Sequence, residues 1–62
     1  MKYKYKLQIY NDTKNEFRWS LIAKNGRIIA NSGEGYRRYK TMFKTINNLF
    51  GDKLSSGEII VI

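Results

Sequence analysis

The sequence of 62 residues contains neither cysteine nor histidine. Disulfides are therefore impossible, and the usual structural zinc sites cannot be built without these ligands. The same absence removes a thiolate nucleophile, a Ser–His pair and an imidazole general base. Five carboxylates are scattered along the chain: Asp12, Glu16, Glu34, Asp52 and Glu58. We therefore expect no catalytic residue, no metal site and no cofactor, and we predict that the protein is not an enzyme.

A chain this short has apolar material for one core, so we predict a single domain over residues 1–62. Such a domain is marginally stable, and without disulfides or metals self-association is the remaining means of stabilising it. Twelve Lys and Arg against five Asp and Glu give a net charge of +7, which attracts nucleic acid but also serves solubility alone. No apolar run reaches membrane-spanning length and lysines interrupt the N-terminus, so we expect no membrane partner and a cytoplasmic location.

Strict alternation of apolar and polar residues predicts two half-buried strands, over residues 3–9 and 17–23. Their inward-facing side chains are Tyr3, Tyr5, Leu7, Ile9, Phe17, Trp19, Leu21 and Ala23. A five-residue loop at 11–15 would join them and pair Tyr5 with Leu21, Leu7 with Trp19, and Ile9 with Phe17.

Asn25-Gly26 predicts a two-residue type I′ hairpin turn into a third strand at 27–31. That turn would pair Ala23 with Ile28 and Leu21 with Ala30. Because both turns keep the apolar residues on one face, the sequence predicts a three-stranded antiparallel meander.

Apolar residues then recur at three- and four-residue steps, which predicts one helix packed on the apolar face of the meander. The stripe consists of Tyr39, Met42, Phe43, Ile46, Leu49 and Phe50. We expect Gly51 to end this helix and Glu34 to lie just before its first turn. Residues 52–56 are then a polar connection to a last strand at 57–62. Its consecutive apolar residues favour a strand buried on both faces and hence a partner chain, the alternative being an exposed edge strand. The fold class is α+β, with the order β-β-β-α-β.

The stretch from Lys6 to Phe50 resembles the YegP-like family of small prokaryotic proteins. The matching residues are Tyr10, Asp12, the run from Phe17 to Leu21, Ala23, Asn25-Gly26, Ile29-Ala30, Ser32-Gly33-Glu34-Gly35-Tyr36, Ile46 and Leu49. The resemblance implies a β-β-β-α-β unit and a homodimer with one continuous sheet, in which the last strand is exchanged. Arg37-Arg38-Tyr39 departs from the family, which more often has small or polar residues there. The family has no assigned activity, so the resemblance implies no reaction.

The segment Gly33, Glu34, Gly35 and Tyr36, called here the glycine loop, is the first candidate site. Its backbone N–H groups could approach an anionic ligand. The alternative, which we favour, is a tight strand-to-helix turn that needs positive φ, with Glu34 as a helix cap and Tyr36 as a packing residue.

A basic sheet face is the second candidate site. It consists of Lys2, Lys4, Lys6, Arg18 and Arg27, with Tyr10, Ile22 and Ile29 on the same side. Cations beside an aromatic ring could follow a phosphate backbone. The favoured alternative is a solvated surface, because Arg37, Lys40 and Lys44 place charge on the other side of the domain. The sequence thus favours a small non-catalytic homodimeric binding or accessory domain, with sequence-nonspecific nucleic-acid binding through the basic sheet face as the alternative.

Overall fold

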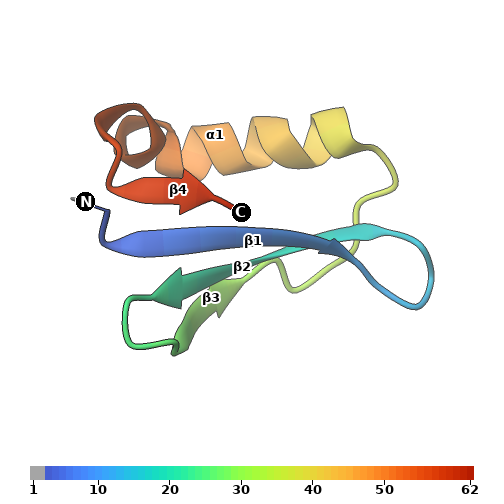
Figure 1. The fold of residues 1–62 in the computed structure, drawn as a ribbon. Helices are drawn as coiled ribbons and strands as arrows, with labels where there is room; N and C mark the ends of the chain where they lie inside the picture. The colour runs from blue at the N-terminus through green and yellow to red at the C-terminus, as the bar shows by residue number, and fades with distance from the viewer. Residues whose placement is uncertain (1–2) are drawn as a thin grey trace.

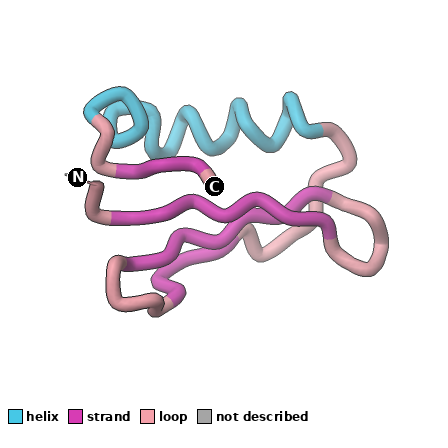
Figure 2. The backbone as a smooth tube through the Cα atoms, in the orientation of Figure 1, coloured by secondary structure: helices cyan, strands magenta, loops and turns pink. Residues whose placement is uncertain are grey.

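The computed structural model describes residues 3–62, which form one mixed sheet and one helix (Figures 1 and 2). The elements are β1 (Tyr5–Asn11), β2 (Phe17–Ala23), β3 (Ile28–Asn31), α1 (Tyr39–Ser56) and β4 (Ile59–Val61). The strand order is β3-β2-β1-β4, with β4 parallel to β1 and the other pairs antiparallel. The helix lies along one side of the sheet (Figure 1). This arrangement confirms the predicted β-β-β-α-β order and the antiparallel meander.

The predicted pairing of β1 with β2 is wrong by two residues. Leu7 pairs with Leu21 and not with Trp19, although the same side chains stay on the inner face. The reason lies in the turn, where the N–H of Asp12 donates to the carbonyl of Glu16 at 2.9 Å and Asn15 takes φ 61°. Strand pairing therefore continues to this pair, and the turn occupies only residues 13–15.

The second hairpin has the same kind of turn, so the predicted type I′ turn is also wrong. Gly26 has φ 90°, but Asn25 is not among the residues with positive φ. The N–H of Gly26 donates to the carbonyl of Ala23 at 2.9 Å. The N–H of Ala23 donates to the carbonyl of Arg27 at 2.8 Å, so the turn occupies three residues with glycine in the left-handed position. Ile28 consequently pairs with Ile22, and a bulge between Leu21 and Ile22 restores the predicted pair of Leu21 with Ala30.

Helix α1 begins later and ends later than the sequence indicated. It runs to Ser56, so Gly51 lies inside it and residues 52–56 are its last turns. Gly57 ends the helix with φ 83°, and its N–H donates to the carbonyl of Leu54 at 3.2 Å. Leu54 follows Phe50 by four residues and packs against the core, which explains the extension.

The start of α1 has no acidic residue in its first turn and no side-chain cap. Glu34 therefore does not cap the helix, contrary to the prediction. Two members of the predicted apolar stripe are also exposed over about half of their surface or more, since 47% of Tyr39 and 61% of Leu49 is accessible.

The core lies between α1 and the inner face of the sheet. Its buried residues are Leu7, Trp19, Leu21, Met42, Ile46 and Ile59. Trp19 meets Phe50 edge to face at 5.5 Å between ring centroids. Tyr3, predicted to face inward, is not among the residues packed on this core. The ammonium groups of Lys6 and Lys24 lie 5.8 and 5.3 Å from the centre of its ring instead.

Strand β4 is an edge strand within the single chain, and the predicted burial of its second face by a partner chain stays a prediction. It pairs with β1 only over the first half of that strand, from Tyr5 to Leu7. Ile59 is buried, whereas 45% of Val61 and 56% of Ile62 is exposed. Within residues 3–62, no helix has the length and apolar character needed to cross a membrane.

Candidate functional site

The glycine loop follows β3 and lies at the edge of the sheet, beside β2. The N–H of Ser32 donates to the carbonyl of Trp19 at 2.9 Å, and the Ser32 hydroxyl accepts the Trp19 N–H at 3.4 Å. Phe17 and Tyr36 then exchange two backbone hydrogen bonds, at 2.7 and 2.9 Å. The chain therefore pairs with β2 just before the loop and again at Tyr36, the last residue of the loop, so the loop is not the start of the helix.

The fold explains why glycine occupies both positions 33 and 35 of the loop. Gly33 takes φ 73°, and its N–H donates to the Asn31 side chain at 3.1 Å. A side chain at Gly35 would collide with Glu16, whose Cβ lies 2.8 Å from the position of the added Cβ. Glu34 is exposed between them. The expected positive φ is thus present at Gly33, and close packing accounts for Gly35.

The predicted basic sheet face is divided between the two ends of the sheet. Arg18 donates from Nε to Oδ2 of Asp12 at 2.7 Å, near the β1–β2 turn. Lys4 forms an ion pair with Glu58 at 3.3 Å, at the opposite end of β1. No ion pair among residues 3–62 engages Lys6 or Arg27, and Lys2 lies outside the described residues.

The ion pairs change the titration of both carboxylates. The hydrogen bond from Arg18 holds the pKa of Asp12 below its ordinary value, and the backbone N–H of Glu16 acts in the same direction. Hydrogen bonds from Lys53 and then Lys4 lower the pKa of Glu58. Two cations of the predicted face are therefore already matched by carboxylates.

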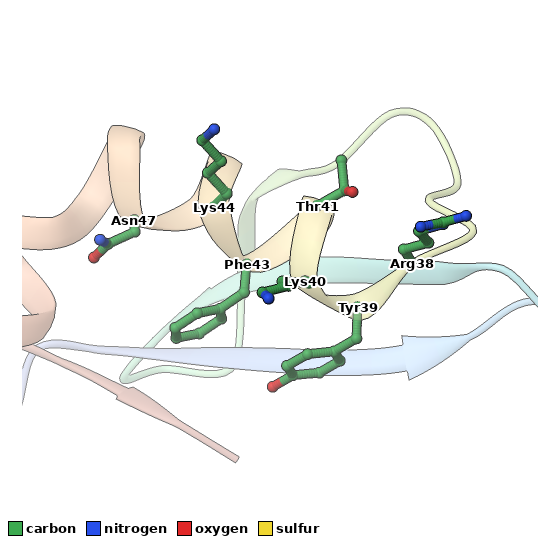
Figure 3. Close-up of a pocket in the computed structure, with 7 residues that line it drawn as sticks. All are labelled: Arg38, Tyr39, Lys40, Thr41, Phe43, Lys44 and Asn47. Carbon is green, nitrogen blue, oxygen red and sulfur yellow. The ribbon is translucent and has the colours of Figure 1, made fainter.

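A groove along the first half of α1 was missed by the sequence-based predictions (Figure 3). This helix groove is open, has a volume of about 650 Å³ and is lined by Arg38, Tyr39, Lys40, Thr41, Phe43, Lys44 and Asn47. The rings of Tyr39 and Phe43 lie parallel within 10°, with centroids 6.0 Å apart. Phe17 supports Tyr39 edge to face at 5.4 Å. The departure from the family pattern at Arg37-Arg38-Tyr39 was the available signal for this site.

The helix groove is cationic and aromatic. No acidic residue lines it, and no ion pair among residues 3–62 involves Arg38, Lys40 or Lys44. In the same part of the chain, no three potential metal-ligating side chains lie together. The arrangement can bind an anion or a flat ring by charge and stacking.

Comparison with known proteins identifies the family of the chain. No curated protein and no solved structure matches it. The model of one family, described as "Domain of unknown function (DUF1508)", matches residues 12–48. This match spans more than half of the chain and includes β2, β3, the glycine loop and the first half of α1. In agreement with the YegP-like resemblance, the chain belongs to the DUF1508 family, whose function is unassigned.

Proposed function

We propose that the protein is a small non-catalytic binding domain that acts as a homodimer, in which two copies exchange β4. The observation that carries the proposal is the exposed apolar end of the chain. About half of the Val61 and Ile62 surface is accessible, at 45% and 56%, although Ile59 at the start of β4 is buried. Apolar side chains on an edge strand favour the addition of further protein surface.

The connection between α1 and β4 is suited to exchange. Only Gly57 and Glu58 separate the two elements. The carbonyl of Glu58 accepts the N–H groups of Lys4 and Tyr5 at 2.7 and 3.0 Å, and Ile62 donates to Leu7 at 2.9 Å. The same bonds can form with β1 of a second copy if the chain opens at this short connection. Exchange would also stabilise a domain that has no disulfide.

The outer edge of the sheet supports a role in binding. The helix covers one face (Figure 1), and the edge strand β3 carries Ile28 and Ile29, which are 61% and 52% exposed. Half-buried Ile22 lies beside Ile28 in the next strand. Contiguous exposed apolar residues often mark protein interaction surfaces.

A cysteine pair across β1 and β4 tests the exchange directly. Lys6 and Ile60 are register partners in the parallel pair, where neighbouring Cα atoms are close enough for a disulfide. The variant with Lys6→Cys and Ile60→Cys, oxidised and run on a denaturing gel without reductant, should give a covalent dimer. Each single-cysteine variant is the control for random crosslinking, since the natural sequence has no cysteine.

Light scattering on the natural chain completes the test. We expect twice the chain mass of 7.3 kDa at micromolar concentration. A monomer would refute the homodimer. A dimer whose cysteine pair closes within one chain would refute the exchange alone, because the copies would then associate by another surface.

A further inference from the structure

We propose that the helix groove binds single-stranded nucleic acid, with the phosphates on its cations and a base on the ring of Tyr39. The proposal concerns a surface other than β4 and does not depend on dimerisation. Gly57, where the chain would open for exchange, lies at the opposite end of α1. The helix between these ends is roughly 27 Å long for its 18 residues.

The charge of the helix groove is complementary to a phosphate backbone. Arg38, Lys40 and Lys44 line it without any carboxylate, and Arg37 precedes them in the chain. In contrast, Arg18 and Lys4 of the basic sheet face form ion pairs with Asp12 and Glu58. A phosphate that binds either residue would first have to displace the carboxylate, which would reduce the net free energy of binding. The groove therefore has three unpaired cations, against Lys6 and Arg27 among the described residues of the sheet face, and this favours the groove.

The aromatic rings indicate that the ligand carries a flat ring in addition to its negative charge. Tyr39 is 47% exposed although Phe17 and Phe43 both contact its ring, at centroid distances of 5.4 and 6.0 Å. These contacts hold the ring in place while part of it faces solvent. Figure 3 shows the rings of Tyr39 and Phe43 side by side, with Arg38 beyond one end of the pair and Asn47 beyond the other. A fixed, partly exposed aromatic ring beside cations is the arrangement on which single-stranded bases stack.

The start of α1 adds to the attraction for phosphate. Its first turn contains no acidic residue and no side chain caps it. The N-terminal N–H groups carry the positive end of the helix dipole, which favours an anion. A duplex, whose bases are stacked inside the helix, offers no base face to Tyr39. We therefore expect single strands to bind more tightly than a duplex of the same length.

The assay is fluorescence anisotropy of labelled oligouridylate and oligothymidylate across a range of salt concentrations, with a duplex as a third probe. Three phosphate contacts predict that log affinity falls with log salt at a slope of about −2, at roughly 0.7 per contact for single strands. Stronger binding of the uridylate would assign the site to RNA, and stronger binding of the thymidylate would assign it to DNA.

The charge variants are matched in net charge. Lys40→Glu with Lys44→Glu removes two of the three lining cations and should reduce the slope to about −0.7, with a loss of affinity of at least about tenfold. Lys14→Glu with Lys24→Glu makes the same change in the two hairpin turns, where both lysines are exposed, and should have a much smaller effect. Equal losses of affinity in the two variants would show that binding depends on net charge alone and would overturn the proposal.

Substitution of Tyr39 separates stacking from charge. Tyr39→Leu should lower affinity between about fivefold and a hundredfold, the usual effect of losing one stacked base, whereas Tyr39→Phe should retain it. Thermal melting of each variant shows whether the domain is still folded. The proposal is wrong if the natural chain binds none of the probes near physiological salt. It is also wrong if Lys4→Glu with Lys6→Glu abolishes binding while the groove variants retain it, which would locate the site on the basic sheet face.

Discussion

Alanine at Gly51 should stabilise the protein, and alanine at Gly57 should destabilise it. Gly51 lies within α1, where alanine is favoured over glycine by roughly 0.8–1.0 kcal/mol. The added Cβ would lie 3.1 Å from Oδ1 of Asn47, an exposed side chain that can rotate away. Gly57 has φ 83°, a conformation that costs an L-residue about 1–2 kcal/mol, and nothing lies within 4 Å of its added Cβ. The two substitutions are therefore chemically identical, but their effects on the free energy of unfolding are opposite in sign.

The predicted changes are measurable for a domain of this size. About 1 kcal/mol shifts the melting temperature by roughly 4–8 °C, upward for Gly51→Ala and downward for Gly57→Ala. Circular dichroism and the fluorescence of Trp19, the single tryptophan, report the transition. All variants should be compared at one protein concentration, because the proposed dimerisation would make the melting temperature concentration-dependent. Gly57→Asn is the matched control and should lose less, since asparagine adopts the left-handed conformation more readily. A destabilising Gly51→Ala with a neutral Gly57→Ala would show that the helix ends at Gly51 and would refute the assignment of its last turns.

Three further predictions follow from the loops and the ion pairs. Gly35→Ala should destabilise the domain by about 1–3 kcal/mol in chemical denaturation because its Cβ meets the Glu16 side chain; unchanged stability would show that the two segments are not in contact. Gly33→Ala should cost less, about 1 kcal/mol, because the only obstacle there is φ 73°; a loss larger than that of Gly35→Ala would contradict this order. In the folded protein, the pKa values of Asp12 and Glu58 lie below their ordinary values of 3.8 and 4.5. The stability that these two carboxylates contribute is therefore present above the ordinary values, and it is lost as the pH falls through the folded-state pKa values. Melting temperature should therefore fall below about pH 5, and Asp12→Asn with Glu58→Gln should flatten that fall; an unchanged profile would exclude these two groups as its cause.

The inner face of the sheet was predictable from the sequence, but its register was not. Alternation assigns Leu7, Trp19 and Leu21 to one face whether the strands pair as predicted or two residues away, because both pairings preserve the side-chain direction. The choice between them depends on which loop residues form the turn. Asn15 accepts a positive φ, and that conformation shortens the turn to three residues. Asparagine at this position is compatible with several turns, so the pattern could not decide.

The end of α1 was mispredicted for a related reason. Gly51 follows a clear apolar stripe, and glycine after a stripe is typical of a helix end. The structure shows that Leu54 extends the stripe by one more step and that Gly57 has the left-handed conformation. In the sequence, both Gly51 and Gly57 are candidates for the residue that ends the helix, and only the packing of Leu54 against the core distinguishes them. The helix groove was missed because the charges of Lys40 and Lys44 were assigned to a solvated face without the neighbouring rings.

The division between folding and binding residues follows from the same contacts. The glycine loop resembles a ligand site in the sequence, yet the pairing of Tyr36 with Phe17, the φ of Gly33 and the contact of Gly35 with Glu16 account for its residues. Folding does not account in this way for the start of α1. Tyr39 exposes about half of its surface, at 47%, and no ion pair among residues 3–62 includes the neighbouring cations. A large exposed aromatic ring among unpaired like charges adds little to stability, because part of the ring stays in water and the charges repel one another. The match to the family includes this segment, and the sequence departs there from the pattern of the resemblance. A binding role specific to this chain is therefore best sought at the helix groove and not at the glycine loop that the family resemblance emphasises.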